Sequence, residues 1–182
     1  MREAVIVSTA RTPMGKAFRG AFNDTEAPAL SGHAVKQAAK KAGIEGSEID
    51  DVIIGCAAQQ GTQSYNLGRL TATAAGLPNS VPGMTLDRQC ASGLMSIGFA
   101  AQSIMTGSMN IVAAGGVESI SMVQNKHKNT YRNVSKLVLS KSQYAYMQMI
   151  ETAEVVSKRY NISRSVQDEY SLQSQQRIAN AQ

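Results

Sequence analysis

Short apolar runs alternate with longer amphipathic stretches from residue 4 to about residue 122. The short runs predict four buried strands, at residues 4–8, 51–55, 84–88 and 110–114. The helical spacing of apolar residues predicts helices over 27–42, 65–75 and 94–105. Because strand and helix alternate, the pattern predicts an α/β fold with a largely parallel sheet and helices on its faces.

The segment after Cys90 differs from the other predicted helices, because residues 94–105 leave almost no polar face. Such a helix should be buried on nearly all sides. Its N-terminus would direct unsatisfied N–H groups and the positive end of the helix dipole toward the cysteine. Those groups favour the thiolate, which is the nucleophilic form. The pattern therefore predicts a covalent catalyst at Cys90, with a buried structural thiol as the alternative.

The composition changes after residue 122. Residues 124–141 are polar and basic without a clear period, and could neutralise phosphates or form a solvated loop. Two helices should come next, one over about 146–160 and one that begins near Ser163 or Ser165, either of which could cap it. We therefore expect two regions, residues 1–122 and residues 123–182.

The totals restrict the function further. The 182 residues carry a net charge of +5, which is too weak and dispersed to indicate a nucleic-acid partner. Two cysteines cannot form a secreted-type disulfide framework, and with the two histidines they do not have zinc-ligand spacing. No apolar run is long enough to span a membrane, and no signal-peptide pattern opens the chain. A reducing, cytoplasmic setting is expected.

Four other features invite functional interpretations. Cys56 comes after a buried strand without a helix or a cation nearby in the sequence, so a structural thiol is favoured. His33 could pair with a cysteine as in papain-like hydrolases, but a solvated or satisfied helix histidine is the commoner case. His127 falls in the basic loop and is expected to be solvated. The run 115–118, Gly-Gly-Val-Glu, lacks the spacing of a phosphate-binding loop and favours a tight turn.

The run from Arg88 to Gly93, Arg-Gln-Cys-Ala-Ser-Gly, resembles the nucleophile motif of the thiolases, which are acetyl-CoA acyltransferases. Further stretches resemble this family in the family's own order along the chain. They are Arg11-Thr12-Pro13, Asn66-Leu67-Gly68-Arg69, Ala114-Gly115-Gly116-Val117-Glu118-Ser119 with Ser121, Thr152-Ala153-Glu154, and Ser163-Arg164 with Gln167-Asp168-Glu169-Tyr170.

The resemblance implies a fold in which two similar βαβαβ-type halves stack into five αβαβα layers, with a loop domain inserted in the first half. Residues 1–122 would be most of the first half, and residues 123–182 only the start of the loop domain. The C-terminal half would be absent, because a complete member is about twice as long. In the intact protein the resemblance implies a homo-oligomer, a dimer or tetramer.

The resemblance also implies a chemistry. Cys90 would take the acyl group of acyl-CoA as a thioester, and its own N–H would help to hold the oxyanion. Coenzyme A would be a substrate, with no permanently bound cofactor or metal. The family's other catalytic motifs, Gly-His-Pro, Cys-x-Gly and Asn-Glu-Ala, do not occur in the 182 residues. The chain alone is therefore expected to be inactive.

Two details qualify the resemblance. Many thiolases carry Asn at the position of Asp87, whose carboxylate would oppose thiolate formation at Cys90, although Arg88 could offset that charge. The Arg-Gln-Cys wording favours the degradative 3-ketoacyl-CoA branch of fatty acid β-oxidation. The alternatives are a non-catalytic fragment or partner-dependent subunit and, less favoured, a condensing enzyme of the ketoacyl-synthase type.

Overall fold

A computed structural model describes residues 2–182. The chain forms two compact units, and the boundary between them falls between residues 129 and 130. The first unit contains a three-stranded parallel sheet with the order β2-β1-β3. Its strands are β1 (Asp51–Gly55), β2 (Gly83–Leu86) and β3 (Val112–Gly116). Val52 pairs with Gly83 on one side of β1 and with Ala113 on the other. The parallel α/β arrangement predicted from the sequence is confirmed.

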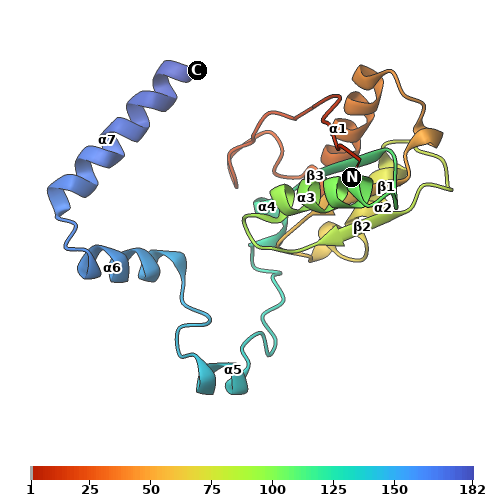
Figure 1. Ribbon diagram of the computed structural model, residues 1–182. Coiled ribbons are helices and arrows are strands. Elements are labelled where there is room, and N and C mark those ends of the chain that lie inside the picture. Colours follow the sequence, from red (N-terminus) through yellow and green to blue (C-terminus); the bar gives the residue numbers. More distant parts are fainter. Residues whose placement is uncertain (1) are drawn as a thin grey trace. The chain divides into compact units, whose positions relative to one another are not determined.

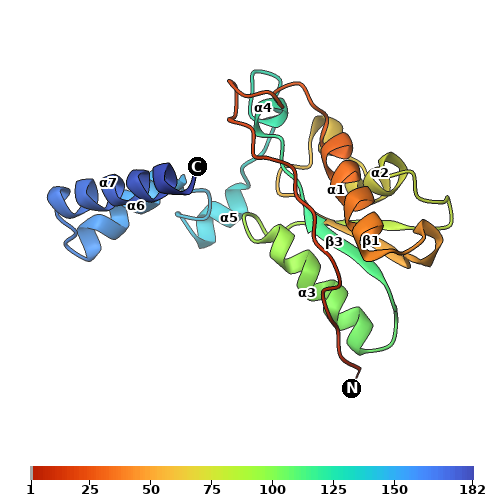
Figure 2. The ribbon, with the colours of Figure 1, turned by 90° about the horizontal axis from the view of Figure 1, so that it is seen from above.

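Helices cover both faces of this sheet. α1 (Ala27–Ala42) packs against α2 (Leu67–Ala74) on one face, and α3 (Ser92–Met105) packs on β1 and β3 on the other (Figures 1 and 2). The single-turn helices η1 (Gly46–Glu48), η2 (Gly61–Gln63) and α4 (Ile120–Val123) lie in the connections. The core is formed by β1 and its contacts with α1 and α2, where Val52, Ile54 and Leu67 are almost completely buried.

Local signals set the bounds of α1. Pro28 stands in its first turn, where a missing N–H is tolerated. Gly43 ends the helix with a φ of 68°, a left-handed conformation that glycine adopts without steric penalty. Both bounds agree with the prediction. α2 begins two positions later than predicted, because the Asn66 side chain accepts a hydrogen bond from the Arg69 N–H at 3.2 Å and caps it.

The predicted strand at residues 4–8 is wrong. This segment is extended but pairs with no strand, and Val5, Ile6 and Val7 are each more than 70% exposed. A cavity of about 390 Å³ separates it from β3, α1 and α3. β-branched residues favour extended backbone, but a strand also needs a neighbour within hydrogen-bonding distance, which the local pattern cannot reveal. The fourth predicted strand forms two residues later, and Gly115 and Gly116 belong to it.

The predicted burial of the helix after Cys90 is also wrong for this chain. One stripe of α3 is buried, at Ser92, Ser96 and Ala100, where small side chains let the helix lie close to the sheet. On the other side Leu94 is 75% exposed, and Phe99 is 38% exposed. The sheet covers one face of the helix, and within the described residues of the first unit nothing covers the opposite face to the same degree.

The second unit, Thr130–Gln182, consists of three helices. They are α5 (Lys136–Lys141), which the sequence did not predict, α6 (Met149–Arg159) and α7 (Arg164–Ala181). Of the two predicted caps, Ser163 is the one that accepts a hydrogen bond, from the Val166 N–H at 3.4 Å. None of the helices among the described residues is long and apolar enough to cross a membrane.

Candidate active site

Cys90 lies in a tight turn between the end of β2 and the start of α3. Gln89, immediately before it, has a φ of 50°, a left-handed conformation that side chains other than glycine rarely adopt. Ser92 closes the turn, because its hydroxyl accepts a hydrogen bond from the Arg88 N–H at 2.8 Å and donates to the Gln89 carbonyl at 2.6 Å. Cys90 is exposed. The turn therefore presents the thiol to solvent beside the first residues of α3.

Asp87 helps to shape the same turn. Its carboxylate accepts a hydrogen bond from the Gln89 N–H at 2.7 Å. Arg88 makes no ion pair with it, since the one ion pair found in residues 2–182 lies within α7. Asp87 thus has a structural task in the turn, one that an Asn side chain could share through its carbonyl oxygen.

The strand order places this turn beside the topological switch point of the sheet. β1 leads to α2 on one face of the sheet and β2 leads to α3 on the other, so the loops that leave these two neighbouring strands diverge at their carboxyl ends (Figure 2). Such positions are where open parallel sheets bind ligands. Main-chain bonds fasten the strand ends here, with the Cys56 N–H donating to the Leu86 carbonyl at 3.0 Å and the Val117 N–H to the Gly55 carbonyl at 3.1 Å.

Glycines let the N-terminus of α3 rest directly on these strand ends. A Cβ on Gly116 would lie 2.9 Å from the Gly93 Cα, closer than real side chains come. A Cβ on Gly55 would overlap the main chain of Ser92. The first turn of the helix after Cys90 is therefore held by contact between backbones, which fixes its position on the sheet.

Cys56 lies in the same region but in a different environment. It is 1% exposed, in agreement with the prediction of a buried thiol. Burial raises the pKa of the Cys56 thiol to about 12, and the negative charge of Glu118 adds to the rise. The Gln63 side-chain amide donates a hydrogen bond to its sulfur at 3.4 Å. This thiol is therefore protonated and inaccessible at neutral pH.

Glu118 is the polar centre of the region. Its carboxylate accepts hydrogen bonds from the N–H groups of Ala57 at 2.9 Å and Ala58 at 3.3 Å, and from the Gln63 side chain. Gln63 is completely buried and also accepts a hydrogen bond from the Ser119 N–H. The two side chains join the loop after β1 to the loop after β3.

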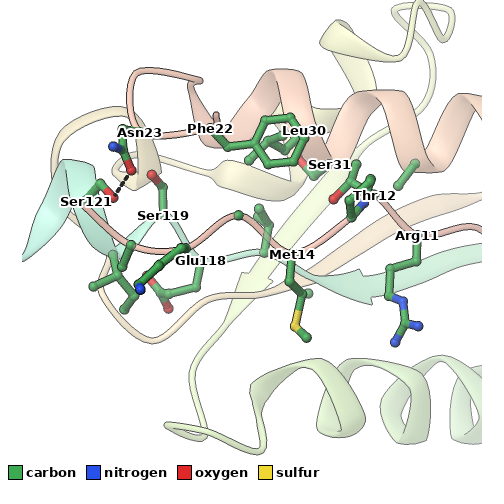
Figure 3. A pocket seen from close by; sticks show the side chains of 18 of the residues that line it. Arg11, Thr12, Met14, Phe22, Asn23, Leu30, Ser31, Glu118, Ser119 and Ser121 are labelled. Atoms are coloured by element: carbon green, nitrogen blue, oxygen red, sulfur yellow. Dashed lines mark hydrogen bonds between the residues drawn. The ribbon is translucent and has the colours of Figure 1, made fainter. Parts of the chain in front are cut away.

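A cavity of about 440 Å³ opens beside Glu118 (Figure 3). Its walls come from the N-terminal loop, from α1 and from residues 116–121. The Ser121 hydroxyl donates a hydrogen bond to the Asn23 side chain at 2.9 Å and so connects two of these walls. Cys90 does not belong to the lining, so the cavity and the thiol are separate features of the same edge of the sheet.

Comparison with known proteins identifies the family. The family model described as "Thiolase, N-terminal domain" matches residues 4–182. The chain is 43% identical over 181 residues to a 3-ketoacyl-CoA thiolase of Bacillus subtilis, an alignment that covers 100% of this chain and 46% of that protein. It is 39% identical to a β-ketoadipyl-CoA thiolase of Pseudomonas putida, of which it covers 49%. The chain belongs to the thiolase family.

A solved thiolase-family structure agrees with this assignment. The crystal structure of the Bacillus anthracis acetyl-CoA acetyltransferase superimposes with a TM-score of 0.77 and 34% identity, over 94% of this chain and 45% of that one. The present chain therefore spans about half the length of the thiolases that it matches. The predicted thiolase-like fold is confirmed for that half.

Both histidines of this thiolase chain are exposed. His33 is exposed on α1, on the face of the sheet opposite α3, and His127 is exposed in the loop after α4. Neither lines the cavity beside Glu118. A cysteine hydrolase that uses His33 therefore has no support in this structure. Among residues 2–182 no group of His, Cys, Asp and Glu is arranged to hold a metal ion.

Sequence reasoning misses Gln63 and the role of Glu118. The Gly-Gly-Val-Glu run draws attention for its glycines and its family resemblance, neither of which gives Glu118 a role. The available signal is a single acidic residue two positions after a strand; the glycines before it, Gly115 and Gly116, end that strand and do not form the predicted tight turn. Its partner Gln63 lies 55 positions earlier, and only the strand order brings the two together.

Proposed function

We propose that this chain carries the acyl-accepting part of a thiolase, with Cys90 as the nucleophile. One observation carries the proposal, namely that the cysteine of the Arg-Gln-Cys-Ala-Ser-Gly run is exposed at the start of α3. A helix start supplies N–H donors and a positive dipole end, which favour a thiolate and a developing oxyanion. The membership of the chain in the thiolase family supports the same chemistry.

The proposed step is an acyl transfer from one sulfur to another. The Cys90 thiolate attacks the carbonyl carbon of an acyl-CoA thioester, and the carbonyl oxygen becomes an oxyanion that the Cys90 N–H helps to hold. The bond between the carbonyl carbon and the sulfur of coenzyme A then breaks. Coenzyme A leaves as a thiolate, which takes up the proton that Cys90 lost. The product is an acyl-Cys90 thioester, and no permanently bound cofactor takes part.

Complete turnover requires groups that the 182 residues lack. The family's activating histidine and second cysteine stand in Gly-His-Pro and Cys-x-Gly motifs, which are absent from this sequence. We therefore expect the chain by itself to have negligible thiolase turnover. A thiolysis rate near that of a full-length thiolase would contradict this expectation.

A partner-dependent subunit is the second candidate, favoured by the exposed apolar face of α3. Large apolar side chains left in water drive association. In the complete protein we expect a homo-oligomer, a cytoplasmic setting and acyl-CoA as the small-molecule partner. The relatives are named for 3-ketoacyl-CoA and β-ketoadipyl-CoA, so we propose a 3-ketoacyl-CoA of the degradative branch as the substrate class.

The acyl transfer can be tested directly. The chain is incubated with acetyl-CoA, and peptide mass spectrometry locates any acetyl adduct. We expect the adduct on Cys90 in the wild type and in Cys56→Ala, and none in Cys90→Ala. Absence of the adduct both in this chain and in a protein of full thiolase length that contains it would rule out the proposed nucleophile.

A further inference from the structure

Glu118 holds the loop after β1 against the end of β3. Its carboxylate accepts hydrogen bonds from the backbone N–H groups of Ala57 and Ala58, at 2.9 and 3.3 Å, and from the Gln63 amide. The Glu118 residue is also exposed to solvent. Hydrogen bonds to an ionised acceptor are about twice as strong as neutral ones. The carboxylate is therefore a strong tie between two loops.

The hydrogen bonds of Gln63 fix the arrangement of the two loops that Glu118 connects. Its side chain is completely buried, and a buried amide left without hydrogen-bond partners is destabilising. Its NH₂ group donates to the Ala58 carbonyl at 2.7 Å and to Glu118, while its carbonyl oxygen accepts from the Ser119 N–H. Donors and acceptors match in only one orientation of the amide. The pair thus sets how the two loops lie against each other.

The same strand ends hold both sides of the Cys90 turn. Before the turn, the Leu86 carbonyl accepts from the Cys56 N–H, next to the loop that Glu118 binds. After the turn, Gly93 rests on Gly116, close to Glu118 in the sequence. Between these anchors Gln89 has its left-handed conformation, with a φ of 50°. Strained backbone of this kind persists only where the surroundings determine it.

We propose that Glu118 is a positioning residue for Cys90, acting with Gln63 through the joined ends of β1 and β3 and not by contact with the reacting atoms. The inference rests on the proposed role of Cys90 and adds the residue pair that keeps its turn in place. Without the hydrogen bonds of Glu118, the strand ends no longer hold the two sides of the Cys90 turn. Gln89 can then leave its left-handed conformation, and the thiol moves away from the start of α3.

The test compares the two cysteines of the full 182-residue chain in their rates of alkylation by iodoacetamide, measured by peptide mass spectrometry. In Glu118→Ala we expect alkylation of Cys90 to slow about fivefold, because the thiol leaves the helix N-terminus. Alkylation of Cys56 should become about tenfold faster, because the loop that covers it opens. Glu26→Ala is the matched control, since Glu26 precedes α1 without a side-chain cap bond and should change neither rate.

A conservative pair of variants separates positioning from general loosening. In Glu118→Gln the two amide NH₂ groups at positions 63 and 118 oppose each other, so Cys90 should again slow. Glu118→Asp keeps a carboxylate that can accept from the Ala57 and Ala58 N–H groups, so its Cys90 rate should lie above that of Glu118→Ala. If Glu118→Ala does not fold, as judged by circular dichroism, Glu118→Gln decides the question.

Three results would overturn the inference. They are an unchanged Cys90 rate in Glu118→Gln, faster alkylation of both cysteines together, and a Cys90 rate in Glu118→Asp no higher than in Glu118→Ala. Alkylation needs no acyl-CoA, so these results are independent of the acetyl-adduct experiment. Missing acetylation with the expected alkylation pattern would count against the proposed function and leave the positioning role intact.

Discussion

Cys56 and Cys90 each stand after a strand of the same parallel sheet, yet the structure gives them opposite properties. The Cys56 side chain is 1% exposed and lies beside Gln63 and Glu118, whereas Cys90 stands exposed at the end of a strained turn. The difference comes from the segment after each strand. After β1 the chain folds into a loop that is bonded to its neighbour, and after β2 it enters a helix almost at once.

A position at the carboxyl end of a strand therefore does not by itself make a thiol reactive. Burial and a nearby carboxylate disfavour the thiolate of Cys56 and raise its pKa to about 12. The turn before α3 instead leaves Cys90 in water, beside a helix N-terminus. Four experiments test this contrast between the two cysteines.

The most direct test is the alkylation of the native wild-type chain at neutral pH. We expect iodoacetamide to modify Cys90 at least about 100-fold faster than Cys56, because Cys90 is exposed whereas Cys56 is buried and its raised pKa disfavours the thiolate. Peptide mass spectrometry measures the two rates. In guanidinium chloride the rates should converge, which serves as the control, and equal rates in the native chain would remove the contrast.

The second test concerns the close contact below the Cys90 turn. In Gly55→Ala the new methyl group would overlap the main chain of Ser92, so we expect a loss of about 3 kcal/mol in unfolding free energy. Gly98→Ala, where nothing lies within 4 Å, should instead gain about 0.5–1 kcal/mol because alanine favours helix. Urea unfolding measures both, and similar effects at the two sites would argue against backbone contact at Gly55.

The third test concerns the pH dependence of stability that Cys56 contributes. The pKa of this thiol is about 12 in the folded state, against 9.0 for an unperturbed cysteine, so the unfolded chain loses the thiol proton first as pH rises. The contribution is therefore fully present below pH 9 and is lost as pH rises toward 12. Denaturant unfolding at several alkaline pH values should give a shallower decline for Cys56→Ala. A decline in Cys56→Ala as steep as in the wild type would contradict the assignment.

Of the four experiments, substitution of Asp87 should give the smallest change. Asp87→Asn keeps an oxygen to accept the hydrogen bond of the Gln89 N–H but removes a negative charge close to Cys90. We expect alkylation of Cys90 to become about two- to threefold faster, as removal of one exposed charge should produce. Unfolding free energy should change by less than about 0.5 kcal/mol. A slower reaction would mean that the carboxylate shapes the turn in a way that Asn cannot.

The accuracy of sequence-based prediction depends on how local each signal is. The bounds of α1 and β1 agree residue by residue, because a proline, a glycine cap and a continuous apolar run act within a few positions. The segment 4–8 has an equally strong local pattern and is still not a strand. The prediction that α3 is buried on nearly all sides failed for a related reason. An apolar surface indicates that a helix can be covered, but it does not show that another segment covers it.

The candidate site divides in the same way. Cys90, its position before a helix and its family motif could be read from consecutive residues. The left-handed Gln89 and the tie between Gln63 and Glu118 could not. These features depend on which strand ends are neighbours, and no periodicity within a single segment carries that information.

Residues that stand close together in the chain were enough to establish the alternation of strands and helices, the candidate nucleophile and the resemblance to the thiolases. The three-dimensional arrangement was needed to establish that Cys56 is inaccessible while Cys90 is open, and that Glu118 joins two loops beside them. The physical reason is that burial and hydrogen bonding between distant residues arise from the order β2-β1-β3, which places segments 55 positions apart in direct contact.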